Sequence, residues 1–453
     1  MLGDIRFYTA LSLENHPILN EKNIYKENYI NALQYFVYKY SNNDVYANKL
    51  MDKYNDSINN NYKIDILQET VLKKSIKKVC EFKLRGFKLF TYRFVFVCDC
   101  VFINAYNNPL LGKKILNEFK TLFNSRYHSG IDELYEVLYN NKNISRDFKL
   151  ADYQVQNWIR NKKFIKQPLE TIMITATMSA GKSTLINAII GKNVLKTKND
   201  SCTAKCYKIY EKAFEDNFVS SISDSISLNT EQKDLMKLND TNTKEIEMGT
   251  FMQLSFDNLS RFCIIDTPGV NSSLDYKHVS ITHEALKKQK YDKLLYLINA
   301  ENIGSEDDLV HIRYVFDNLD DNKVVFGLNK LDRFRKNEDS ISESLDKIYN
   351  QLINIGFREP TIVPVSAYAG QLFKKVLCGL TLNDDENDEC LMLLKKFSKN
   401  EFDLSTYYKD PISWQGKVTN SIDKYTPLQV AECLRKSGLP SLEKLISRED
   451  ARQ

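Results

Sequence analysis

The chain has 453 residues, 43% of them hydrophobic and 27% charged, which is ordinary for a globular protein of about two or three domains. Its net charge of +4 is small for this length, so the chain as a whole does not carry the charge of a nucleic-acid binder. The nine cysteines form no CxxC pair, which argues against a zinc site or a disulfide framework and favours reduced thiols in a cytoplasmic protein.

The start of the chain lacks the basic, apolar and small-residue pattern of a secretory signal. The most apolar run, Phe94–Tyr106, is interrupted by Asp99 and is shorter than the roughly 20 residues that a membrane-spanning helix needs, so we predict a buried helix there. We therefore expect a cytoplasmic protein, with peripheral contact to a membrane as the alternative.

Residues 1–165 repeat apolar side chains at helical spacing and contain few turn residues. Breaks at Asn107-Asn108-Pro109 and at Ser129-Gly130 separate the segments. This pattern predicts a small helical bundle with its own core. The predicted helices are Asn23–Tyr40, Asn43–Tyr54, Ile66–Phe82, Leu89–Ala105, Lys113–Phe123 and Gly130–Tyr139.

A basic segment, Lys73–Arg93, lies within this helical region and carries eight basic residues and one acidic residue, Glu81. It is suited to an anionic lipid surface or a nucleic acid. A solvated helix face over an apolar core is the commoner explanation of such a segment, and no nucleic-acid-binding motif accompanies it. We favour the solvated face.

From Glu170 onward, short β-rich runs alternate with amphipathic helical stretches. Several of the runs are almost continuously apolar, as strands covered on both faces should be. This alternation predicts an α/β domain with a mostly parallel central sheet flanked by helices, over residues 166–453. The predicted strands are Thr171–Thr175, Lys205–Tyr210, Phe262–Ile265, Lys293–Asn299, Lys323–Leu328 and Thr361–Pro364.

Two polar stretches interrupt this pattern. Residues 215–249 are rich in Ser, Asn, Asp and Lys, and we expect an exposed helix or a mobile loop there. From about residue 371 the pattern is mainly helical, and the acidic cluster Asn383–Glu389 is expected to be an exposed loop.

The segment Ala176–Thr184, Ala-Thr-Met-Ser-Ala-Gly-Lys-Ser-Thr, follows a predicted strand and opens a predicted helix, which is the setting of a phosphate-binding loop. Gly181 lets the backbone approach a β-phosphate, Lys182 is expected to reach the β- and γ-phosphates, and Ser183 is expected to bind Mg²⁺. Ala176 stands at the usual first glycine. The residues expected to hold the nucleotide here are Met178, Ser179, Ala180, Gly181, Lys182, Ser183 and Thr184.

Two further elements are expected to meet the γ-phosphate and the metal. Thr203 lies in a polar stretch between two strands and is our candidate for closing on Mg²⁺ and the γ-phosphate, with Thr197 and Ser201 as alternatives. In Asp266-Thr267-Pro268-Gly269, Asp266 ends an apolar strand, where it can bind Mg²⁺ through water. The Gly269 amide can contact the γ-phosphate.

The segment Asn329-Lys330-Leu331-Asp332 follows another apolar strand. The Asp332 carboxylate can accept hydrogen bonds from guanine N1 and N2, a donor pair that adenine lacks, so the site is expected to select GTP over ATP. Ser366-Ala367 would then place a backbone amide on guanine O6. His278 and His283 follow Gly269 closely; we expect them to be solvated or packed rather than near the phosphates.

These motifs together resemble the dynamin-like superfamily of GTPases. The resemblance is firm over about residues 170–370 and rests on residues 178–188, 266–269 and Ser305-Glu306-Asp307-Asp308. Gly438-Leu439-Pro440-Ser441-Leu442 looks like the segment that closes such G domains. Only about 80 residues follow Ala367, so we expect the long stalk of the family to be short or missing here.

The resemblance implies Mg²⁺-dependent GTP hydrolysis, stimulated when two G domains dock, with Lys182, Ser179, Thr203 and Gly269 as catalytic residues. It also implies K⁺ beside Ser179 at the phosphate loop. The glutamine of dynamin is Met178 here, and Val270 follows Gly269 where another GTPase class has glutamine. We therefore expect slow basal turnover.

The helical bundle more faintly resembles a TerB-like module and is expected to bind an unidentified protein partner. The alternative function is a nucleotide-gated scaffold that binds GTP and recruits that partner with little turnover.

Overall fold

The computed structural model describes most of the chain, and the residues it describes are 5–59, 93–143, 148, 151–197, 205–235, 238, 243–256, 260–270, 276–335, 338–416, 418 and 420–447. The chain forms two compact units. One unit comprises residues 1–166 with the short segments 212–220 and 226–230, and the other comprises 167–211, 221–225 and 231–453. The two short segments were not expected in the helical unit.

The first unit is built from helices, as its apolar spacing predicts. Its described helices are α1 (Asn23–Tyr40), α2 (Val45–Asn59), α5 (Arg93–Ala105), α6 (Pro109–Leu122), α7 (His128–Asn140) and α8 (Asp152–Ile165). The bounds of α1 are those predicted. Asn108 caps α6 by accepting a hydrogen bond from the Leu111 N–H at 3.1 Å, with Pro109 at the first position, so the predicted break is a helix start. Helix α8 was not predicted.

Helix α5 lies in the middle of this unit's core, and every residue in it except Phe94 is buried. Its one acidic residue, Asp99, accepts hydrogen bonds from His16 Nε2 at 2.8 Å, Tyr29 Oη at 2.5 Å and Tyr54 Oη at 2.9 Å. A buried carboxylate is tolerated when its oxygens are satisfied in this way. Among the described residues, no helix is both long and apolar enough to cross a membrane.

Residues 212–220 join the helical unit through a buried carboxylate. Asp216 Oδ2 accepts hydrogen bonds from the Leu11 N–H at 2.9 Å, Lys53 Nζ at 3.3 Å and Lys212 Nζ at 3.1 Å. Asp216 has no solvent exposure. Since a buried carboxylate that loses its partners is costly, these contacts account for the grouping of this segment with the helices.

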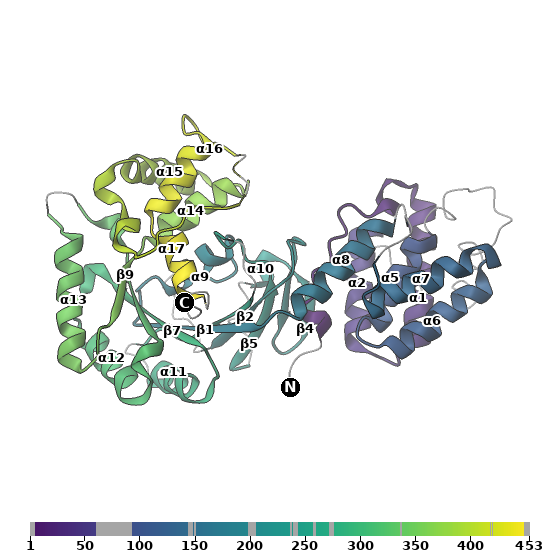
Figure 1. Ribbon diagram of the computed structural model, residues 1–453, viewed down its shortest axis with the longest axis horizontal. Helices are drawn as coiled ribbons and strands as arrows, with labels where there is room; N and C mark the ends of the chain where they lie inside the picture. Colours follow the sequence, from purple (N-terminus) through teal and green to yellow (C-terminus); the bar gives the residue numbers. More distant parts are fainter. Residues whose placement is uncertain are drawn as a thin grey trace. The chain divides into compact units, whose positions relative to one another are not determined.

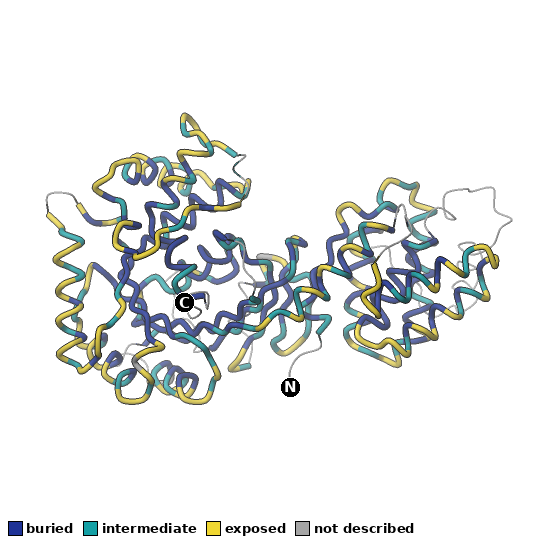
Figure 2. Tube along the Cα trace, viewed as in Figure 1, coloured by how far each residue is buried: buried dark blue, intermediate teal, exposed yellow. Residues whose placement is uncertain are grey.

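A nine-stranded sheet runs in the order β4-β3-β5-β2-β6-β1-β7-β8-β9. Strand β1 pairs in parallel with both β6 and β7, and β8 pairs in parallel with β7 and β9, whereas β2 runs antiparallel to β6. The central strands are buried (Figure 2), which fits their near-continuous apolar runs. The predicted mostly parallel α/β fold is confirmed. The strands are β1 (Leu169–Ala176), β2 (Cys206–Glu211), β3 (Val219–Ile222), β4 (Ile226–Thr230), β5 (Glu245–Thr250), β6 (Arg261–Asp266), β7 (Lys293–Asn299), β8 (Val324–Asn329) and β9 (Thr361–Pro364).

The expectation of an exposed helix or loop over residues 215–249 is wrong. This stretch supplies β3, β4 and β5, and the four-residue helix α10 (Gln232–Leu235) lies between β4 and β5. In β5, the buried Ile246 and Met248 alternate with Glu245 and Glu247, and the strand pairs in parallel with β2. The alternation of apolar and polar residues that is typical of a strand was present in the sequence, but the polar composition of the whole stretch made it hard to recognise.

Helices cover both faces of the sheet in the second unit. Figure 1 shows α11 and α12 on one face, and α9 with α14 and α17 on the other. The acidic cluster Asn383–Glu389 opens α15 and is not a loop. Asn383 and Glu386 form a capping box there, and acidic side chains favour a helix N-terminus. The helices are α9 (Lys182–Ile190), α11 (Tyr276–Lys288), α12 (Glu306–Asn318), α13 (Ile341–Ile355), α14 (Ala367–Leu377), α15 (Asp384–Phe397), α16 (Pro427–Lys436) and α17 (Leu439–Ile446).

The predicted helix Ile66–Phe82 and the basic segment up to Tyr92 lie outside the described residues. Arg93, the last residue of that segment, is buried at the start of α5. Its guanidinium carbon lies 3.5 Å from the centroid of the Tyr127 ring, so Arg93 is not part of a solvated basic face.

Candidate functional site

The predicted phosphate loop joins β1 to α9. The Val270 N–H donates to the Ala176 carbonyl and the Met178 N–H donates to the Val270 carbonyl, both at 3.0 Å, so the loop is held by the segment that follows β6. Ser179 (φ 63°) and Gly181 (φ 90°) take left-handed backbone conformations. A Cβ at Gly181 would also collide with the Asn329 amide, so only glycine suits this position.

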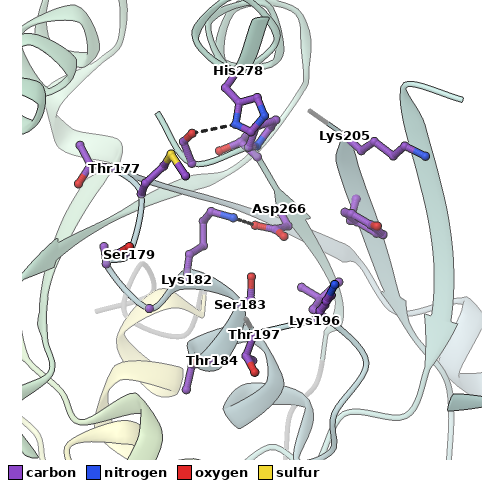
Figure 3. A pocket seen from close by; sticks show the side chains of 18 of the residues that line it. Thr177, Ser179, Lys182, Ser183, Thr184, Lys196, Thr197, Lys205, Asp266 and His278 are labelled. Carbon is purple, nitrogen blue, oxygen red and sulfur yellow. Dashed lines mark hydrogen bonds and ion pairs between the residues drawn. The ribbon is translucent and has the colours of Figure 1, made fainter. Parts of the chain in front are cut away.

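Lys182, the first residue of α9, forms an ion pair with Asp266 at the end of β6 (Figure 3). Both side chains are nearly buried, with 10% and 8% of their surface exposed. Burial raises the pKa of Asp266, and the neighbouring Lys182 ammonium opposes that shift. The ion pair therefore brings Lys182, which was predicted to bind phosphate, into contact with Asp266, which was predicted to bind the metal.

A cavity of about 320 Å³ opens over this ion pair. It is lined by all seven predicted phosphate-loop residues from Met178 to Thr184, and by Asp266, Gly269 and Lys330. Thr203 and its alternative Ser201 lie outside the described residues, whereas Thr197, the other alternative, lines the cavity. Within the described residues, no cluster of three or more His, Cys, Asp or Glu side chains could hold a metal ion.

The predicted base-recognition residues are joined to the phosphate loop by one side chain. Asn329, at the end of β8, donates from Nδ2 to the Ala180 carbonyl at 2.9 Å and accepts from the Ala367 N–H at 3.0 Å through Oδ1. Ser366 donates from Oγ to Asp332 Oδ1 at 2.7 Å. The structure thus links Asn329, Asp332, Ser366 and Ala367, which belong to segments more than thirty residues apart.

Two charged groups hold the segment around Asp332. Lys330 and Arg333 both contact Glu301, at 3.0 Å and 3.1 Å. Lys396, from α15, donates to the carbonyls of Asp332 at 2.6 Å and Phe334 at 2.5 Å. Burial lowers the pKa of Lys396. The C-terminal helices thereby support the predicted base site.

The segment Ser305–Asp308 supports the start of the phosphate loop through a hydrogen bond to Thr177. Ser305 caps α12, and Asp308 accepts hydrogen bonds from Thr177 Oγ1 at 2.9 Å and from Tyr296 Oη at 3.1 Å. Burial raises the pKa of Asp308, and the Thr177 hydrogen bond opposes that shift. These contacts give the Ser-Glu-Asp-Asp motif a positional role that its spacing alone did not reveal.

Other residues that line the cavity were not predicted. They are Thr177, Leu195, Lys196, Lys205, Tyr207, Thr267, Pro268, His278 and Arg333. His278 was expected to be solvated or packed, but its ring lies at the cavity wall with Nδ1 3.2 Å from the Gly269 carbonyl oxygen (Figure 3). Its position nine residues after Gly269 was the only signal in the sequence. His283, in contrast, stacks on Tyr314.

The family model that describes the dynamin family matches residues 172–331. This stretch begins in β1 and ends at Leu331, so it contains the phosphate loop, Asp266, Gly269 and Asn329. This part of the chain is similar to a dynamin-like G domain. Guanine-nucleotide binding is the property that this assignment supports.

Two curated relatives match the G domain region more broadly. The chain is 28% identical over 255 residues to an uncharacterized protein in the xynA 3′ region of Caldicellulosiruptor sp. (strain Rt8B.4), covering 52% of this chain and 60% of that protein. It is 25% identical over 229 residues to dynamin-like protein A of Bacillus subtilis (strain 168), covering 49% of this chain and 18% of that protein. The match thus spans less than two thirds of each relative.

Solved structures resemble the chain only distantly. A structure of an oligomerised bacterial dynamin pair covers 80% of this chain and 65% of its own, with 16% identity and a TM-score of 0.36. Toc33 from Arabidopsis thaliana, in complex with Mg²⁺ and GMPPNP, covers 64% of this chain and 93% of its own, with 11% identity and a TM-score of 0.34.

Proposed function

We propose that the G domain binds GTP with Mg²⁺ in the cavity over the Lys182–Asp266 pair and hydrolyses it to GDP and phosphate. The observation that carries the proposal is the meeting of Lys182, Ser183 and Asp266 in one cavity at the start of α9. A helix N-terminus that lines a cavity and begins with a lysine favours a phosphate chain, because its amides and the ammonium both attract negative charge.

The residues present fit Mg²⁺. Ser183 supplies a hydroxyl and Asp266 a carboxylate, which are the hard oxygen donors that Mg²⁺ takes alongside water and phosphate oxygens. Bound there, the ion would neutralise charge on the β- and γ-phosphates. Lys182, now held by Asp266, would turn its ammonium to the β- and γ-phosphates. Thr203 remains our candidate for the second protein hydroxyl that binds Mg²⁺, beside that of Ser183.

For the base, we propose that Asp332 accepts hydrogen bonds from guanine N1 and N2 while the Ala367 region meets O6. The Ser366 hydroxyl, 2.7 Å from Asp332 Oδ1, supports this assignment because it holds the carboxylate in place. A fixed carboxylate discriminates strongly against adenine, since it would be left without donors.

We further propose that two G domains dock to stimulate hydrolysis, with K⁺ beside Ser179. Ser179 lines the cavity in a left-handed backbone conformation, and its hydroxyl is the kind of oxygen ligand that K⁺ takes. A cytoplasmic location is part of the proposal and agrees with the free cysteines among the described residues.

The alternative is a nucleotide-gated scaffold with negligible turnover. One observation favours it: the two positions expected to orient water are apolar and packed. Met178 lies within contact distance of Gly269, and Val270 is buried in a bridge with Thr177.

Hydrolysis of GTP measured against protein concentration separates the two functions, with wild type beside Lys182→Ala in potassium and in sodium. A rate that rises more than linearly with protein, depends on potassium and disappears in Lys182→Ala supports the dimer-activated enzyme. Tight GTP binding without turnover at every concentration supports the scaffold.

A further inference from the structure

Asn187 is a fully buried polar side chain of α9, the helix that begins at the phosphate loop. Its Oδ1 accepts hydrogen bonds from the Val194 N–H at 3.0 Å and the Leu195 N–H at 2.9 Å, and its Nδ2 donates to the Leu195 carbonyl at 2.9 Å. Breaking these bonds would leave buried polar groups unpaired, which is costly. One side chain of α9 therefore fixes the backbone of two consecutive residues.

The chain folds back along α9 after the helix ends. Gly191 (φ 86°) takes a left-handed conformation at the end of the helix, and Leu195 is then bonded to Asn187. Asn187 lies four residues after Ser183, which is about 6 Å along a helix axis, and the two residues from Leu195 to Thr197 span up to about 7 Å. Thr197 therefore reaches the level of Ser183, and both residues line the cavity (Figure 3).

The fixed segment ends at the cavity wall with Thr197, whose side chain is exposed. A threonine hydroxyl rotates to donate its proton to an oxygen that only accepts, such as a phosphate oxygen. The N–H groups at the start of α9 favour a phosphate chain beside Ser183, so a hydroxyl at the same level faces that chain. Because the position of Thr197 is set from the helix, this contact is the same whether or not a γ-phosphate is present.

We propose that Asn187 is a positioning residue, which holds Thr197 so that its hydroxyl donates a hydrogen bond to a phosphate oxygen that GTP and GDP share. This inference rests on the proposed nucleotide binding. It gives two threonines of one segment different roles: Thr197 contributes affinity for both nucleotides, and Thr203 remains the candidate for Mg²⁺ and the γ-phosphate. The sequence alone offered both threonines for the second role.

A mutant cycle tests this arrangement. Thr197→Val replaces the hydroxyl of an exposed side chain with a methyl group of similar size, Asn187→Ala removes the three hydrogen bonds, and the double variant completes the cycle. Asn193→Ala is the matched control, because Asn193 lies in the same loop but accepts a hydrogen bond from the Gln371 side chain at 2.6 Å. Thr197→Val by itself still tests the contact if Asn187→Ala does not fold.

Two measurements are made on the full chain. Calorimetric titration with GDP and with a non-hydrolysable GTP analogue, both in the presence of Mg²⁺, gives the two affinities. Steady-state hydrolysis of GTP gives kcat and KM, and thermal unfolding shows which variants are folded.

We expect Thr197→Val and Asn187→Ala each to bind GDP and the GTP analogue about tenfold more weakly, because a hydrogen bond to a charged oxygen typically contributes this much. The double variant should lose no more affinity than the weaker of the two single variants, since Asn187 acts through Thr197. KM for GTP should rise in the same proportion while kcat changes by less than about twofold, which is the pattern of lost uniform binding. Asn193→Ala should bind both nucleotides like the wild type.

Three results would overturn the inference. The first is wild-type affinity in Thr197→Val. The second is a loss for the GTP analogue without a loss for GDP, which would place Thr197 at the γ-phosphate end. The third is additive losses in the double variant, which would show that Asn187 does not act through Thr197. All three leave the proposed function standing, whereas a wild type that binds neither nucleotide overturns both.

Discussion

The side-chain amide of Asn329 donates a hydrogen bond to the carbonyl oxygen of Ala180, 2.9 Å away, and so ties the end of β8 to the phosphate loop. The same side chain accepts from the Ala367 N–H. Because Asn329 is buried and makes both contacts, a movement of the phosphate loop is transmitted directly to the proposed base site.

Replacement of Asn329 by alanine should therefore weaken both parts of the site. It leaves the Ala180 carbonyl and the Ala367 N–H unpaired in a buried place, which costs about 1–3 kcal/mol for each group. We expect GTP and GDP affinity to fall at least about tenfold, which corresponds to 1.4 kcal/mol, with a lower Tm. Calorimetric titration and thermal unfolding measure the two effects. The exposed Asn322→Ala is the control, and unchanged affinity in Asn329→Ala would contradict the coupling.

Lys396→Met should reduce nucleotide affinity from a distance. It removes the two hydrogen bonds to the Asp332 and Phe334 carbonyls but keeps the length of the side chain. We expect the affinity for GTP to fall about three- to tenfold. Each hydrogen bond from a charged donor contributes about 1.5–3 kcal/mol to holding the loop, and only part of this energy is transmitted to nucleotide binding, because the loop can reorder. The neighbouring Lys395 is exposed, so Lys395→Met should bind GTP like the wild type. Equal effects of the two substitutions would argue against support of the base site by α15.

The ion pair between Lys374 and Glu443 should dominate the stability of the C-terminal helices. Both side chains are fully buried, and they link α14 to α17, while Lys374 also donates to the Ile189 carbonyl of α9 at 3.1 Å. Glu443→Gln leaves a buried ammonium without its counter-charge, so we expect a loss of about 3–5 kcal/mol in the free energy of unfolding. Glu284→Gln, which breaks an exposed pair with Lys288, should leave the free energy of unfolding nearly unchanged, because solvent and salt screen such a pair.

Denaturant unfolding of the two variants measures this contrast. The double variant Lys374→Met/Glu443→Leu removes both charges and should recover most of the lost stability. Equal losses in Glu443→Gln and Glu284→Gln would contradict a burial-dependent role for the pair.

Glu211 should make stability depend on pH. Burial raises the pKa of this carboxyl to about 8 from an ordinary value of 4.5, with the Phe262 N–H and Arg261 opposing the shift. Between those two values the native state retains a proton that the unfolded chain has released, so the free energy of unfolding falls as the pH rises from 4.5 to about 8. Above about pH 8 the carboxyl has released its proton in both the native and the unfolded state, so the free energy of unfolding no longer falls with pH.

Glu211→Gln removes this dependence and keeps an acceptor for the Phe262 N–H. We expect the variant to be more stable than the wild type at pH 8, by a few kcal/mol at roughly 1.4 kcal/mol per pKa unit, and equally stable near pH 4. Thermal unfolding from pH 4 to pH 8.5 tests this expectation, with the exposed Glu338→Gln as control. A constant difference across the pH range would show that Glu211 is not the titrating group.

Local sequence patterns predicted the α/β class, the helical unit and the phosphate loop, because each depends on spacing within a few residues. The apolar run Lys293–Asn299 and the helix Asn23–Tyr40 are observed with the predicted bounds. Strands β3 to β5 were missed because pairing stabilises these polar segments: β5 pairs with β2, β3 lies next to β5, and β4 lies next to β3. Composition does not encode such pairing.

The sequence by itself determined which residue types are available for the proposed chemistry: a glycine for close backbone approach, a lysine proposed for phosphate, hydroxyl and carboxylate oxygens proposed for a metal, and an aspartate proposed for guanine. The tertiary structure alone decided which side chains hold these groups in place. Asn329 joins the phosphate loop to the segment at Ala367, and Asp308 supports the phosphate loop through Thr177. Lys396 reaches back from a helix more than sixty residues later, and His278 lines the cavity. The physical reason is that a motif records local backbone needs, whereas hydrogen bonds between distant segments depend on how the sheet and its helices pack.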